Sequence, residues 1–268
     1  MKRIYIFLVI LLGSASSAFA WSNKAAATIA EVAARKLTPE AREAVASVIS
    51  TPLSENANFL AKERKEGREL YSNEWHYVEF YNTLHPMLEN DANAITQVEK
   101  AVAALRNRAE LPAAEVRRNI LILVNLVSDI HCIANVRIDG MERTYSGFSF
   151  SRWNNRSGSR SRYNKIGWQA LWRNHFASRR GVLSVSDYAA EMLMFFSEDD
   201  FSNFAQGTPT DWAVEVAKEA DFLLRETFAS GATIRMEDYN RMENYHERNI
   251  ARAGARIAML LNDIFATK

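Results

Sequence analysis

Apolar residues recur along most of this chain at the three-to-four-residue spacing of amphipathic helices, so the pattern predicts an all-α fold. The clearest helix start is Thr38-Pro39-Glu40-Ala41, where a capping threonine precedes a proline at the first helical position and an acid in the first turn. The predicted helices cover residues 38–49, 92–107, 112–133, 182–196, 210–228 and 236–265.

The predicted helix 112–133 is apolar on all sides over its inner part. Because Asn125 is the single polar residue between positions 120 and 127, we expect this helix to be central and buried. Asn125 and Asp129 are four residues apart and share one face. A carboxylate in such a helix needs a partner, since an unpaired buried charge is costly. That partner is either a basic side chain, giving a salt bridge, or a metal or substrate cation.

The helical pattern is interrupted between Asp139 and Lys165, a region rich in Gly, Ser, Asn and Arg. Residues 147–153 alternate between apolar and polar, and the turn residues Asn154-Asn155 and Ser157-Gly158 follow. This arrangement predicts a β-hairpin or an irregular excursion around 139–165. No repeat or linker divides the chain, so we expect one domain spanning residues 21–268.

The first twenty residues are typical of a secretory signal. Lys2 and Arg3 precede an apolar run over residues 4–12, and Ala18-Phe19-Ala20 is a small-x-small cleavage site. We therefore expect a periplasmic or secreted protein whose mature chain begins at Trp21. The alternative is an uncleaved anchor, which the shortness of the apolar run disfavours.

Charge and cysteine content narrow the possibilities further. The chain has 33 basic and 32 acidic residues, and removal of the signal leaves a mature charge of about −1, so affinity for nucleic acid would require a local basic patch. Cys132 is the single cysteine, which excludes an internal disulfide. Because Cys132 lies in an apolar stretch, we expect a buried, inert thiol.

Two aromatic positions are candidates for chemistry. His76 lies between Trp75 and Tyr77, where a histidine is either a hydrogen-bonded structural residue or a ligand. Trp21 follows directly after the predicted cleavage site and either fills the core with its ring or uses its new amine.

Taken in order along the chain, these segments resemble the S1/P1 nucleases, a family of secreted zinc-dependent enzymes that cut single-stranded nucleic acid. The opening of that family, Trp-Gly-x-x-Gly-His, corresponds to 21–26, and its central motif, His-x-x-Gly-Asp-x-His-Gln-Pro-Leu-His, corresponds to 125–135. Further matches are found at 37–41, 75–77, 212–215 and 253–265. The resemblance spans the mature chain and implies the phospholipase C/P1 nuclease type of helical fold.

The resemblance also implies a three-zinc site, of which this chain retains only part. Trp21, His76 and Asp129 match family ligands, and Asp129 matches the metal-bridging aspartate. The other ligand positions are occupied by residues that do not usually bind zinc: Ala26, Lys65, Asn125, Asn135, Gln169 and Arg173.

These replacements predict the loss of phosphodiesterase activity, because zinc in the family activates the attacking water. We expect no cofactor. Zinc would be bound, and Asp129 would be catalytic, only if the activity of the family survives. A lysine or arginine can take over the charge role of a metal, so we expect Asp129 to pair with Lys65 or Arg173.

The interrupted region suggests a second role. Arginines alternate there with aromatic residues, a composition suited to phosphates and stacked bases, and Tyr77 matches a base-stacking position of the family. We expect the ligand to be a nucleotide, single-stranded nucleic acid or another anion. The candidate ligand-binding residues are Tyr77, Arg152, Trp153, Arg156, Arg160 and Arg162. The alternatives are a solvated basic loop without a ligand, an active single-strand endonuclease with a rebuilt metal site, and a structural or partner-binding envelope protein.

Overall fold

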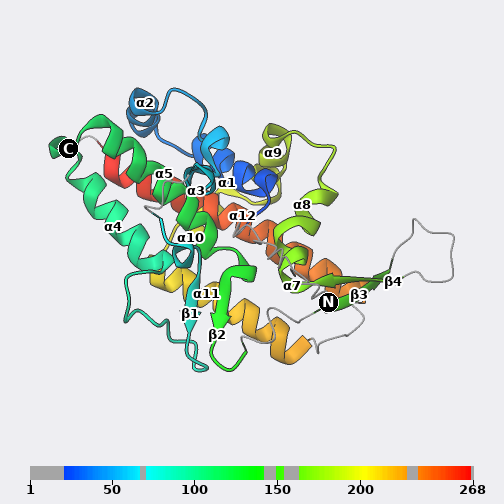
Figure 1. The fold of residues 1–268 in the computed structure, drawn as a ribbon. Coiled ribbons are helices and arrows are strands. Elements are labelled where there is room, and N and C mark those ends of the chain that lie inside the picture. The colour runs from blue at the N-terminus through cyan, green and yellow to red at the C-terminus, as the bar shows by residue number, and fades with distance from the viewer. Residues whose placement is uncertain (1–20, 67–70, 142–148, 154–162, 228–234, 267–268) are drawn as a thin grey trace, which may run out of the picture.

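The computed structural model describes residues 21–66, 71–141, 149–153, 163–227 and 235–266 of the chain (Figure 1). It is mostly helical with little strand, which confirms the all-α class. The α-helices are α1 (Asn23–Arg35), α2 (Pro39–Val48), α3 (Phe59–Lys65), α4 (Ala94–Arg106), α5 (Ala113–Ile130), α7 (Trp168–Ala170), α8 (Phe176–Arg179), α9 (Val185–Phe195), α10 (Glu198–Phe204), α11 (Pro209–Asp221) and α12 (Met236–Phe265). The predicted signal, residues 1–20, lies outside the described residues.

Short helical turns complete the architecture. The 3₁₀ turns are η1 (Leu53–Asn56), η2 (Asn73–His76), η3 (Arg108–Glu110) and η4 (Ile133–Asn135), and the π-helical segments are η5 (Leu171–His175) and η6 (Phe222–Thr227). Segment η6 continues α11, so the predicted helix 210–228 is one element whose last turns are widened. Phe228 lies beyond the described part.

Side-chain caps explain where several helices begin. Thr38 accepts a hydrogen bond from the Ala41 amide, as its sequence context predicts. The helix predicted from Ala92 begins at Ala94 because Asn93 caps it. The helix predicted from Val182 begins at Val185 because Ser184 forms a capping box with Asp187.

Helices α5 and α12 form the centre of the molecule (Figure 1). Every residue of α5 from Ile120 to Ile130 is buried, which confirms the central helix expected from its apolar run. Helix α12 covers the predicted span 236–265 and packs along α1 and α5. In the described part of the chain, no helix is both long enough and apolar enough to cross a bilayer.

Two small strand pairs accompany the helices. Strands β3 (Ser149–Trp153) and β4 (Tyr163–Gly167) pair antiparallel, so of the two forms expected for the interrupted region, the β-hairpin is the one observed. Strands β1 (Val78–Phe80) and β2 (Val136–Ile138) pair parallel, a contact the pattern did not predict because each strand has only three residues.

Cys132 follows α5 and is fully buried, as expected. Burial raises the pKa of its thiol to about 12, so the thiolate is scarcely populated at neutral pH.

Gly254 marks the close crossing of α12 over α1. A methyl group at Gly254 would lie 2.5 Å from Cγ1 and 2.8 Å from Cβ of the buried Val32. We expect Gly254→Ala to lower the free energy of unfolding by about 1–3 kcal/mol. The measurement is urea unfolding of Gly254→Ala in the wild-type and Val32→Ala backgrounds. If overpacking is the cause, the loss is smaller when Val32 is shortened; equal losses in both backgrounds would contradict this contact.

Candidate functional site

The parallel pair β1–β2 brings the first candidate residues together. Its register places Val78 opposite Val136, so the segments directly before the two strands, which end in Tyr77 and Asn135, lie side by side. The amide Nδ2 of Asn135 donates to the main-chain oxygen of His76 at 2.7 Å. The pairing therefore fixes the end of η2 against η4, next to the C-terminal end of α5.

His76 and Asp129 form the centre of the site. Nδ1 of His76 lies 2.5 Å from Oδ2 of Asp129, and both side chains are about nine-tenths buried. Burial raises the pKa of the Asp129 carboxyl above its ordinary value, and the interaction with His76 and the charge of Arg173 oppose that rise. The imidazole is thus the direct partner of the buried carboxylate.

This geometry corrects the expected pairing of Asp129 with Lys65 or Arg173. Lys65 is exposed on α3. Arg173 lies on η5 and is buried, but it acts on Asp129 only through its charge and forms no ion pair with it. A histidine takes the direct position because η2 ends beside the last turn of α5, whereas the guanidinium of Arg173 is directed to other acceptors.

Those acceptors are neutral oxygen atoms. Nη2 of Arg173 lies 3.2 Å from Oδ1 of Asn135 and 3.5 Å from the hydroxyl oxygen of Tyr77. The Tyr77 side chain is buried, and the guanidinium of Arg137 lies over its ring at 3.6 Å. The ring expected to stack on a base is thus stacked on an arginine of the same chain.

Arg137 was not predicted as part of the site. Its Nη1 donates to Glu74 at 2.7 Å and to Glu79 at 2.9 Å, so two carboxylates hold it over Tyr77. In the sequence, the signal for a basic partner here was Glu74 and Glu79, two acids that flank His76 and Tyr77. Only the parallel pairing of β1 with β2 brings Arg137 to them.

Trp21 connects two of the elements that carry the site. Its indole Nε1 donates to the main-chain oxygen of Ser128 on α5 at 2.7 Å, and the amide of the next residue, Ser22, donates to the main-chain oxygen of Arg173 at 2.7 Å. The ring is buried in an edge contact with His246. The ring of Trp21 therefore fills the core, which is one of the two roles expected for this residue. The role of its amine stays a prediction.

The remaining replaced ligand positions are satisfied within the protein or lie apart. Asn125 donates to the main-chain oxygen of Leu121 at 2.9 Å and accepts from the Leu60 amide at 3.4 Å. Ala26 is buried in α1, and Gln169 is half-buried in α7.

The predicted ligand-binding residues of the interrupted region are described only in part. Arg152 and Trp153 belong to β3, of which only the backbone is described. Arg156, Arg160 and Arg162 lie outside the described residues.

The donor set does not fit a three-zinc centre. Zinc takes about four nitrogen, sulfur or carboxylate ligands per ion, whereas His76 and Asp129 are the two such side chains brought together here. Within the described ranges, no group of three or more His, Cys, Asp or Glu side chains has the arrangement to hold a metal ion.

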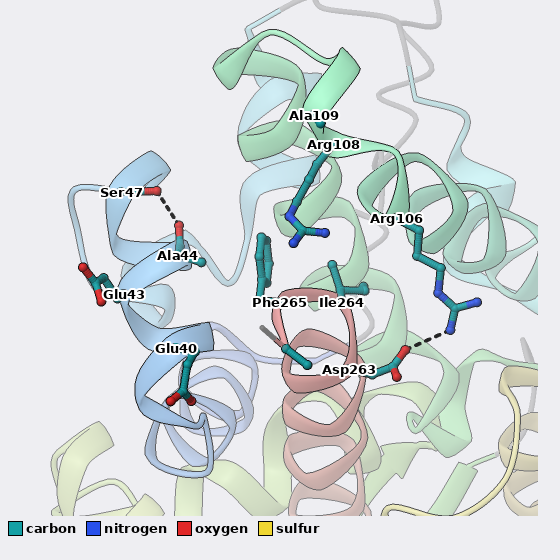
Figure 2. A pocket seen from close by; sticks show the side chains of 11 residues that line it. Glu40, Glu43, Ala44, Ser47, Arg106, Arg108, Ala109, Asp263, Ile264 and Phe265 are labelled. Carbon is teal, nitrogen blue, oxygen red and sulfur yellow. Dashed lines mark hydrogen bonds and ion pairs between the residues drawn. The ribbon is translucent and has the colours of Figure 1, made fainter. Parts of the chain in front are cut away.

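A separate hollow of about 1210 Å³ lies where α2, the end of α4 and the end of α12 meet (Figure 2). The guanidinium of Arg108 lies over the ring of Phe265 at 4.9 Å, and Arg106 is paired with Asp263 at 2.9 Å. None of the predicted site residues lines this hollow.

Comparison with known proteins adds no relative: neither a family model nor a curated protein matches the chain. The candidate site therefore rests on its own geometry.

Removal of His76 should expose the cost of burying Asp129. Without the imidazole that opposes it, the pKa of Asp129 rises further, and His76→Ala should lose about 3–5 kcal/mol of unfolding free energy at pH 7. A buried carboxyl with a raised pKa destabilises the folded state only at a pH where the group would be ionised in the unfolded chain. The stability deficit of His76→Ala should therefore shrink as the pH falls towards 3.8, the ordinary pKa of an aspartate. The measurement is denaturant unfolding across that pH range. Adding Asp129→Asn to His76→Ala should restore stability at pH 7, and a deficit that does not change with pH would refute the assignment.

Proposed function

We propose that this chain is an exported protein of the S1/P1 nuclease-like, phospholipase C/P1 type that no longer hydrolyses phosphodiesters and instead binds nucleotides or single-stranded nucleic acid. The observation that carries the loss of hydrolysis is the closed His76–Asp129 pair, 2.5 Å apart and surrounded by amide and guanidinium groups. The proposed exported, periplasmic or secreted location rests on the signal-like residues 1–20.

Charge balance supports the loss of hydrolysis. A metal ion at this position would have to compete with the imidazole for the Asp129 carboxylate, and it would lie close to the positive charge of Arg173. Each of these effects lowers the affinity for a cation. Asn125 and Asn135 have their amide groups bonded to main-chain atoms, so they are not available as spare ligands without a change in the surrounding structure.

The arrangement of the chain supports a binding role. The β3–β4 hairpin leads directly through α7 into η5, the segment that carries Arg173. The interrupted region, which is rich in arginine and aromatic residues, is therefore joined by a short connection to the buried cation of Arg173. Guanidinium groups and aromatic rings together suit phosphates and bases.

The absence of hydrolysis has a direct test. We expect the purified exported protein, supplied with zinc, to leave single-stranded DNA and RNA uncleaved and to retain no stoichiometric zinc by elemental analysis after dialysis. His76→Ala serves as the matched control and should give the same blank result. Robust cleavage that is abolished by both a chelator and His76→Ala would overturn the proposal in favour of an active endonuclease.

The binding role has a separate test. We expect binding of a single-stranded oligonucleotide at low salt to weaken at least about tenfold when Gln replaces Arg152, Arg156, Arg160 and Arg162, because phosphate contacts are lost. Each lost contact should also reduce the slope of log affinity against log salt concentration by about 0.7. A variant with four arginines changed elsewhere, the exposed Arg42, Arg64 and Arg106 and the half-buried Arg118, is the control and should bind like the wild type. No binding by the wild type at low salt would favour a solvated loop or a structural envelope protein.

A further inference from the structure

Arg173 and Arg256 are the buried arginines of the described residues, and their surroundings differ sharply. Arg256 donates to the Glu215 carboxylate at 2.6 Å and to the main-chain oxygen of Phe204 at 2.8 Å. Arg173 is 8% exposed, yet no ion pair joins it to a carboxylate of the described residues. One buried cation is thus neutralised inside the protein, and the other lacks a direct anionic partner.

The hydrogen bonds of Arg173 do not make up for this difference. Its contacts to Asn135 and Tyr77, at 3.2 and 3.5 Å, are longer than the 2.7–2.9 Å typical of charge-assisted bonds, and both acceptors are neutral. Its Nε atom is buried and has no hydrogen-bond partner. The charge of the nearby Asp129 compensates the guanidinium in part, and an anionic ligand would supply the direct partner that the described residues do not.

The segment that carries Arg173 is itself irregular. Residues Leu171–His175 form the π-helical segment η5 between α7 and α8, and such widened turns occur often at functional sites because they redirect one side chain. The main-chain oxygen of Arg173 is held by the Ser22 amide at 2.7 Å. The backbone that carries the guanidinium is therefore fixed, which favours a preorganised receptor for a ligand group.

We propose that Arg173 is the receptor for a phosphate group of the bound ligand. A phosphate offers several strong acceptor oxygens and negative charge, which match the forked donors of a guanidinium. The Tyr77 hydroxyl, 3.5 Å from Nη2 of Arg173, can donate to the same phosphate. This inference deepens the proposed nucleotide-binding function and rests on it for the rest of the ligand, but the cation is assigned from its own surroundings.

Arg137 provides a matched control beside the site, because it makes no contact with Arg173. It also touches Tyr77, but Glu74 and Glu79 already satisfy it, and its side chain is 32% exposed. Removing Arg137 deletes an arginine of the same neighbourhood without deleting the unpaired cation. The two arginines should therefore differ in how they affect phosphate binding.

The experiment measures the stability and phosphate binding of the exported protein, with Arg173→Met and Arg137→Met as variants. Inorganic phosphate at constant ionic strength should raise the unfolding temperature of the wild type and of Arg137→Met. In Arg173→Met the affinity for phosphate, measured by titration calorimetry, should fall about 10- to 100-fold. Without phosphate, Arg173→Met removes both the buried cation and the charge that it contributes at Asp129, so its unfolding temperature there serves to check that the variant is folded.

The outcomes separate this inference from the function on which it rests. A nucleoside monophosphate that binds more tightly than inorganic phosphate, with the same dependence on Arg173, supports the assignment of a nucleotide phosphate. Oligonucleotide binding that Arg173→Met leaves unchanged overturns the role of Arg173 but not the binding function. An equal response of wild type and Arg173→Met to phosphate, or no response by either, also overturns it.

Discussion

The carboxylate of Asp129 is the feature around which the rest of the site is organised. It belongs to a helix whose residues from Ile120 to Ile130 are all buried, so its charge must be met by other groups. His76 meets it directly at 2.5 Å, and Arg173 contributes its charge from farther away. Two separate chain segments must therefore reach the last turn of α5, and the connections around them are arranged to bring them there.

Small backbone contacts hold those segments in place. The three-residue strands β1 and β2 lock the end of η2 to η4, and Asn135 then bonds to the main chain of His76. The Trp21 ring is tied to α5, and the adjacent Ser22 amide is tied to η5, so the first described residues connect the carboxylate helix to the arginine segment. A shift in any one of these contacts would change the distance between His76, Asp129 and Arg173.

In a second buried polar network, between α11 and α12, the charge of a buried arginine is fully compensated by neighbouring groups. Arg256 is bonded to Glu215 and to Nε2 of His131, whose pKa is held well below its ordinary range by burial and by the neighbouring arginine. In its neutral form, His131 donates from Nδ1 to the main-chain oxygen of Val127 at 2.7 Å. All three guanidinium nitrogens of Arg256 have a partner, whereas Nε of Arg173 has none among the described residues.

The sequence by itself determined the helical class, the central position of α5, the extent of α12 and the hairpin in the interrupted region, because periodicity, caps and turn residues are local signals. It also singled out His76, Asp129, Asn135 and Arg173 and required a partner for the buried carboxylate. Only the tertiary structure decided that His76, and not Lys65 or Arg173, is the direct partner, and that Arg137 covers Tyr77. Those outcomes depend on the β1–β2 register and on the end of η2 meeting α5, contacts between segments some fifty residues or more apart that leave no periodic pattern in the chain.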